Sequence, residues 1–229
     1  MNRDQQQIID ETRRFFRKVY GWMFLGLIIS GITAYWIASD PSLYKIILLN
    51  GFIFHSLLIG ELALVFGLVW LMKKISVQLA IFMFLLYSFM TGLTLSVIFL
   101  AFTIESIGQI FFISAGMFGV MSIYGYFTKR DLTHIGQVLI MGLIGIVFIG
   151  LANFFIKNSQ LDYVLSFIGV IVFTGLTAYD TQKIRKFNII GNEGTAEDTK
   201  ESIMGALRLY LDFINLFLSL LKLFGKRKR

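Results

Sequence analysis

Long runs of residues without a single charged side chain constrain this sequence more than any other feature. Four such runs cover residues 19–39, 75–104, 106–128 and 132–156. A helix needs roughly 20 predominantly apolar residues to cross the hydrocarbon core of a bilayer, and each run is long enough. We therefore predict a membrane-spanning helix in each of these four runs.

Three further apolar stretches are also long enough to cross the bilayer, and each includes an acidic residue. They are residues 52–72 with Glu61, residues 163–182 with Asp180, and residues 203–224 with Asp212. The expected fold is an all-α membrane protein with seven transmembrane helices. The predicted spans are approximately 19–38, 52–72, 77–102, 107–127, 134–156, 162–184 and 203–224.

The rest of the chain is short, so we predict one membrane domain and no separate soluble domain. A cytoplasmic N-terminal segment covers residues 1–18, the seven-helix domain covers residues 19–225, and a basic tail covers residues 226–229. The absence of cysteine excludes disulfides and thiolate metal sites. We expect no cofactor.

The net charge of +7 does not indicate a nucleic-acid partner, because the basic residues sit at the ends of the predicted helices. Such residues set membrane topology and contact the anionic head groups of the bilayer. Lys and Arg gather before the first span and after the second, fourth and sixth, so the positive-inside rule predicts a cytoplasmic N-terminus. Seven crossings then place the basic tail outside, against the rule, unless the last helix is re-entrant.

Three acidic residues, Glu61, Asp180 and Asp212, require an explanation because a charge at the centre of a spanning helix costs roughly 2.5–3.5 kcal/mol. One explanation is a private ion pair, in which each aspartate binds its own basic partner on the same helix. Lys183 follows Asp180 by three residues, and Arg208 precedes Asp212 by four. Glu61 has no basic residue within one turn, so its partner would be a hydrogen bond from a neighbouring helix, or a proton.

A second explanation treats Asp180 and Asp212 as a pair. The two residues fall at similar depths on consecutive predicted helices. Two carboxylates that meet in a low dielectric cannot both ionise cheaply, so they share a proton or bind a divalent cation with oxygen ligands. Such a pair would sense pH, and we predict that the two aspartates sense protons and bind a divalent cation.

Three functions fit intramembrane acids of this kind, and only one of them is enzymatic. They are an ion channel or leak pathway with a diacid gate, an intramembrane aspartyl protease, and a non-conducting membrane regulator. The protease is disfavoured because Asp212 stands in "LYLDFIN" rather than in a Gly-x-Gly-Asp setting, and the single proline, Pro41, lies outside the core. We therefore predict that the protein is not an enzyme.

Two C-terminal segments, "IGVIVFTGLTAYDTQKIRK" (168–186) and "LYLDFINLFLSLLKLFG" (209–225), resemble the signature of the Bax inhibitor family, also called the transmembrane Bax-inhibitor-motif family. Three earlier segments, "VYGWMFLGL" (19–27), "YSFMTGLTLSVIF" (87–99) and "AGMFGVMSIYGYFTKRDL" (115–132), are similar to its bacterial inner-membrane branch. The resemblance covers nearly the whole chain and implies a location in the cell (inner) membrane.

The resemblance implies a fold in which the seventh helix is central, and a pH-sensitive calcium leak controlled by an aspartate pair. Those aspartates correspond to Asp180 and Asp212. The basic residue that latches onto the sixth-helix aspartate would be Lys73 or Lys74, which cannot make the bidentate contact of an arginine. Besides these lysines, Arg208 is a candidate for holding the gate when the aspartates ionise. Glu61 matches an acid within the second helix of some relatives, and would be part of the ion pathway.

Overall fold

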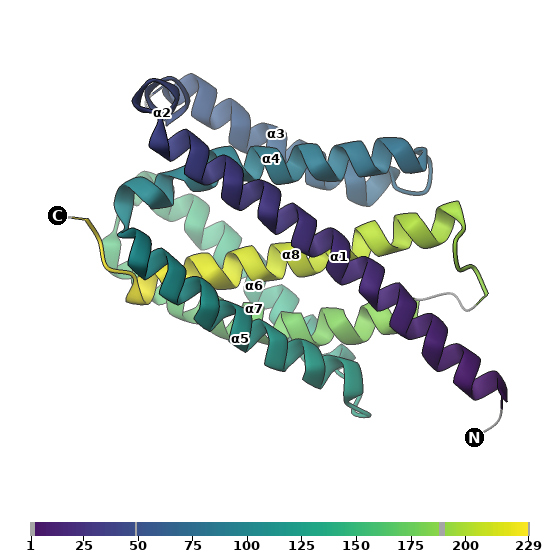
Figure 1. Cartoon of the computed structure of the whole chain (residues 1–229). Coiled ribbons are helices and arrows are strands. Elements are labelled where there is room, and N and C mark those ends of the chain that lie inside the picture. Colours follow the sequence, from purple (N-terminus) through teal and green to yellow (C-terminus); the bar gives the residue numbers. More distant parts are fainter. Residues whose placement is uncertain (1–2, 49, 188–190, 229) are drawn as a thin grey trace. The chain divides into compact units, whose positions relative to one another are not determined.

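The described residues of the computed structural model, 3–48, 50–187 and 191–228, form eight α-helices (Figure 1). Residues 1–2 of the predicted N-terminal segment and Arg229 of the predicted tail lie outside the described residues. In chain order the helices are α1 (Arg3–Ser39), α2 (Pro41–Leu48), α3 (Gly51–Leu71), α4 (Val77–Ala101), α5 (Ile104–Phe127), α6 (Thr133–Ile156), α7 (Ser159–Phe187) and α8 (Ala196–Phe224).

Within the described part of the chain, all of these helices except the short α2 are long and apolar enough to cross a membrane. The prediction of an all-α protein with seven transmembrane helices is thus confirmed. The sixth and seventh predicted spans are α7 and α8. Two helices extend well beyond the apolar stretches that indicated them: α1 begins at Arg3 and α8 begins at Ala196.

Short polar side chains define where several helices begin. Asn50 accepts hydrogen bonds from the backbone N–H groups of Phe52 and Ile53 at the start of α3. Thr103 accepts one from the N–H of Ser106 at the start of α5. Such caps satisfy N–H groups that have no partner inside the helix, so the chain can turn within a few residues.

The chain forms two compact units, and α8 contributes to both. The first unit holds residues 1–101 and 187–210. In it, α1 packs against α4, which also packs against α3. Gly92 lets α1 and α4 approach closely, because a Cβ atom at this position would lie 2.8 Å from the carbonyl oxygen of Ser30. The Ser30 hydroxyl in turn shares a 2.6 Å hydrogen bond with the Tyr210 hydroxyl of α8.

The second unit holds residues 102–186 and 211–229. Glycines again permit close contact between helices: Gly125 of α5 contacts the backbone of Ala178, and Gly136 of α6 contacts the ring of Tyr179. The second half of α8 packs against α5 through aromatic rings, and the Phe213 and Phe111 ring centroids are 5.4 Å apart.

The residues of α8 are the most shielded of any spanning helix. In its most apolar stretch, 72% of the residues are buried, compared with 6% in α3 and in α6. This burial favours the predicted central position of α8, which stays a prediction. The helix is continuous over 29 residues, about 43 Å at 1.5 Å per residue, and has no turn that would return it to its starting side. A single crossing fits this continuous helix better than a re-entrant segment, and the side of the membrane on which the tail lies stays a prediction.

Candidate functional site

Both predicted aspartates are shielded from their surroundings. Asp180 of α7 is 9% exposed and Asp212 of α8 is 4% exposed, and both belong to the second compact unit. Side chains on the lipid-facing helices are far more open, as Phe155 of α6 is 80% exposed. Burial inside the protein removes the cost of placing a carboxyl group against acyl chains.

A contact between α7 and α8 fixes how the two aspartates are oriented. A Cβ atom on Gly169 of α7 would lie 2.6 Å from the Ser219 hydroxyl oxygen of α8, so the two helices touch here. Asp180 is 11 residues after Gly169, and Asp212 is 7 residues before Ser219. These spacings are about three and about two helical turns, so each aspartate lies on the face of its helix that makes the contact.

The same contact also sets the relative depth of the aspartates. Successive spans cross a membrane in opposite directions, so residues after Gly169 and residues before Ser219 lie toward the same end. The two distances along the helices differ by four residues, which is about 6 Å. Whether the two carboxyl groups meet across these facing sides is part of the diacid prediction.

The part of α7 that carries Asp180 is tied to the turn between α5 and α6. The side chain of Gln182 donates to the carbonyl oxygen of Arg130 at 2.8 Å and accepts from the N–H of Leu132 at 2.9 Å. The guanidinium of Arg185 donates to the carbonyl oxygen of Tyr126. The contacts of Gly125 with Ala178 and of Gly136 with Tyr179 restrain the same part of α7. Together with these hydrogen bonds, they hold the backbone at Asp180 in a defined position.

Outside the membrane-spanning part of this unit, an ion pair joins the α5–α6 turn to the end of α7. Lys186 Nζ lies 2.9 Å from Asp131 Oδ1, which also accepts a hydrogen bond from the hydroxyl of Thr133 at 2.7 Å. The hydrogen bonds from Lys186 and Thr133 lower the pKa of Asp131 to about 2.

Glu61 faces a neighbouring helix, as predicted. The hydroxyl of Thr94 on α4 donates a 2.8 Å hydrogen bond to Glu61 Oε1. The same hydroxyl lies 3.0 Å from the carbonyl oxygen of Thr91. The carboxyl group is half-buried in the first unit, so its role as part of an ion pathway remains a prediction.

The candidate gate cations occupy different settings. Lys73 and Lys74 are exposed in the turn between α3 and α4 and belong to the first unit. Arg208 is half-buried on α8, four residues before Asp212 and therefore on the same face. Lys183, the other possible ion-pair partner, places its Nζ 5.2 Å from the ring centroid of Tyr179, within cation–π distance.

The donor set limits how calcium could bind. Among the described residues, histidine and acidic side chains form no cluster of three or more that could hold a metal ion. Two carboxylates supply at most four oxygens, whereas calcium takes six to eight. An ion held by Asp180 and Asp212 would need water molecules or backbone carbonyls as its remaining ligands.

The sequence did not indicate which part of the chain the N-terminal turns of α1 contact. Its side chains bind the connection between α7 and α8: Lys18 lies 2.5 Å from Asp198, and Arg14 lies 2.6 Å from Glu193. The hydrogen bond from Arg14 lowers the pKa of Glu193. Asp198 is only 2% exposed. In the sequence, only the i, i+4 spacing of Arg14 and Lys18 indicated that these two side chains share one face of a helix.

Comparison with known proteins finds relatives in bacteria, one of which is named as an inner membrane protein. The family model "Inhibitor of apoptosis-promoting Bax1" matches residues 12–229. The chain is 47% identical over 215 residues to inner membrane protein YbhL of Escherichia coli, covering 93% of this chain and 92% of that protein. It is 42% identical over 228 residues to a protein of Borreliella burgdorferi, covering 100% of this chain and 98% of that protein.

Proposed function

The chain belongs to the Bax inhibitor family, and on this basis we propose that it provides a pH-sensitive calcium leak across the cell membrane. The observation that supports the proposal most directly is the placement of Asp180 and Asp212. Both are buried in one unit, on the faces by which α7 and α8 touch, with an offset of about 6 Å along the helices.

Protonation of this pair would control the pathway. When the carboxyl groups carry one shared proton, a hydrogen bond holds α7 and α8 together. When both are ionised they repel, and the buried charge must be neutralised by a cation. Calcium would serve as that cation while it passes, and Lys73, Lys74 or Arg208 would serve when the pathway is closed.

Calcium flux into proteoliposomes at a series of pH values tests the proposal. We expect flux to depend on pH in the wild type, and Asp180→Asn and Asp212→Asn each to change that dependence while the helical content is retained. Glu105→Gln, which removes an exposed acidic charge from the first turn of α5 without touching the aspartates, is the control and should retain the profile. A profile indifferent to both aspartate substitutions would contradict the proposal.

The orientation of the chain is part of the same proposal. We place the N-terminus in the cytoplasm because four basic clusters then face inward. A reporter fused after Lys74 should be active on the cytoplasmic side of the membrane. Activity only on the outer side would reverse the topology.

A non-conducting regulator is the second candidate function. It is favoured by the description of the matching family model, which names an inhibitor of another protein. In that case the buried aspartates would serve helix packing, and the purified protein would show no calcium flux above that of empty vesicles at any pH.

A further inference from the structure

The basic segment after α8 is held in place rather than extending from the helix end. The N–H of Thr103 donates to the carbonyl oxygen of Lys226 at 3.0 Å, and the N–H of Lys226 donates to the hydroxyl of Ser106 at 2.8 Å. An isolated antiparallel bridge also pairs Phe102 with Arg227. The segment is thus fastened to the connection between α4 and α5, and all of these residues belong to the second unit.

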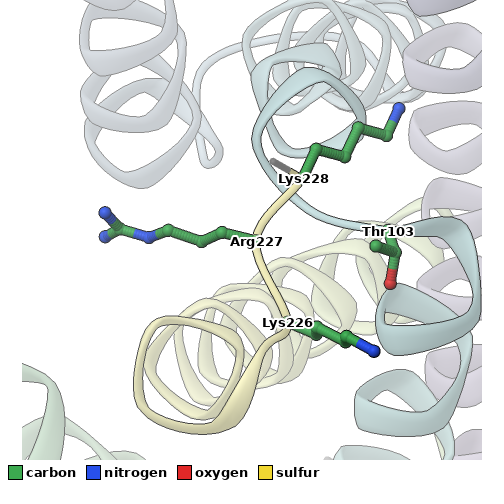
Figure 2. Close-up of a pocket in the computed structure, with 4 residues that line it drawn as sticks. All are labelled: Thr103, Lys226, Arg227 and Lys228. Atoms are coloured by element: carbon green, nitrogen blue, oxygen red, sulfur yellow. The ribbon is translucent and has the colours of Figure 1, made fainter.

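This attachment separates the basic side chains into two directions. In an extended segment, successive side chains point to opposite sides. Figure 2 shows Lys226 and Lys228 on the side where Thr103 lies, and Arg227 pointing the other way. An open cavity of about 750 Å³ is lined by Thr103 and residues 226–228.

On the side of the segment where Thr103 lies, the cavity has three groups that can donate hydrogen bonds to an anion. Two are the ammonium groups of Lys226 and Lys228. The third is the hydroxyl of Thr103, whose oxygen accepts the capping N–H of Ser106 and whose hydrogen can point outward. This combination suits a phosphate group, which offers several acceptor oxygens and a negative charge.

The position of the segment indicates where such a phosphate would come from. Seven crossings would place the segment on the opposite side of the membrane from the start of α1, on the side whose other connections carry few basic residues. Consecutive cations at the end of a membrane helix repel one another and need a counter-charge. Phospholipid head groups supply phosphate at this depth in every bilayer.

We propose that Lys226, Lys228 and Thr103 form a binding site for the phosphate of an anionic phospholipid. The lipid would neutralise the basic segment and anchor the end of α8 at the membrane surface. This site would also account for basic residues on the side that the positive-inside rule disfavours. The proposal does not depend on calcium transport.

Native mass spectrometry and thermal unfolding of the full chain in nanodiscs test the site. The nanodiscs would contain phosphatidylcholine with increasing fractions of phosphatidylglycerol. We expect the wild type to retain phosphatidylglycerol selectively and to unfold at a higher temperature as its fraction rises. Lys226→Gln and Lys228→Gln should each weaken this retention on the order of fivefold, the effect of losing one cation near an anionic surface.

Lys157→Gln is the matched control, because it removes the same charge from an exposed position in the connection between α6 and α7, which does not line the cavity. We expect it to retain the lipid nearly as the wild type does. An equal loss for Lys157→Gln would show general attraction of the lipid to basic residues and overturn the site. So would equal retention of phosphatidylcholine and phosphatidylglycerol by the wild type, or the same thermal shift from inorganic phosphate in phosphatidylcholine alone.

Discussion

Gly125 and Gly119 lie on the same helix, α5, in opposite surroundings, and this contrast gives a test at the scale of single residues. A Cβ atom on Gly125 would collide with the backbone of Ala178, whereas one on Gly119 would have no neighbour within 4 Å. We expect Gly125→Ala to lower the free energy of unfolding by about 1–3 kcal/mol, because backbone cannot move aside as a flexible side chain can.

Gly119→Ala is the control for this substitution. It should leave stability unchanged or raise it by up to about 1 kcal/mol, since alanine favours a helix more than glycine does. Thermal unfolding of both variants in the same detergent measures the difference. Equal effects of the two substitutions would mean that α5 and α7 do not approach as closely as the structure has them.

The sequence could predict some residues of the site and not others, and the reason is physical. Glu61, Asp180 and Asp212 could be found because a carboxyl group in an apolar stretch is costly and therefore conspicuous. Asp198 could not be found, since an acid in a polar loop is ordinary, and only the fold shows that it is buried against Lys18. The facing of Asp180 and Asp212 required the contact of Gly169 with Ser219.

At the scale of elements, hydropathy indicated the spans but not the full helices. The bilayer requires apolar residues only where the chain crosses its core, so the polar beginnings of α1 and α8 lack the signal. Both are helical in the structure. The contacts of Arg14 and Lys18 with the α7–α8 connection stabilise these extensions in a way that hydropathy does not register.

The pairing of Lys18 with Asp198 should restrain the start of α8. Asp198 is buried and also accepts a 2.9 Å hydrogen bond from the N–H of Gly194. We expect Lys18→Gln to lower the local free energy of opening by about 1.5–3 kcal/mol, the range for hydrogen bonds to charged groups. Hydrogen exchange of residues 191–200 measures this opening.

Arg17→Gln provides the control for Lys18→Gln, because Arg17 neighbours Lys18 on α1 and is exposed. It should leave exchange in residues 191–200 as in the wild type. If the two variants accelerated exchange equally, the net charge of α1 rather than the specific pair would hold the connection.

The ion pair between the α5–α6 turn and α7 should respond to acid. The pKa of Asp131 is lowered to about 2 by its hydrogen bonds with Lys186 and Thr133. Because the folded pKa lies below the ordinary value of about 3.9, the stabilisation is present above pH 4 and is lost as the pH falls toward 2. Lys186→Gln should raise the pKa of Asp131 toward its ordinary value.

Carbon-13 NMR titration of labelled aspartate side chains measures the pKa of Asp131 in both proteins. High salt should also raise it, since both side chains are largely exposed to solvent and their attraction is screened. An unchanged value in Lys186→Gln would assign the shift to Thr133 alone.

At the scale of the whole molecule, the pairing of the two aspartates predicts how the effects of their substitutions combine. If Asp180 and Asp212 share a proton, either asparagine substitution destroys the same pair. The effects of Asp180→Asn and Asp212→Asn on the pH dependence of calcium flux should therefore not add, and the double variant should resemble each single one. Flux assays on the wild type, the two single variants and the double variant form a double-mutant cycle that measures this coupling.

Private ion pairs would give a different outcome in the same experiment. Asp180 with Lys183 and Asp212 with Arg208 would be independent, so the two substitutions would reduce stability additively and leave the flux profile unchanged. Glutamine at Lys183 or Arg208 would then reproduce the loss caused by the asparagine at the partner aspartate. With a shared proton instead, Lys183→Gln should leave the coupling between the aspartates intact, because the offset of about 6 Å across the α7–α8 contact depends on neither cation.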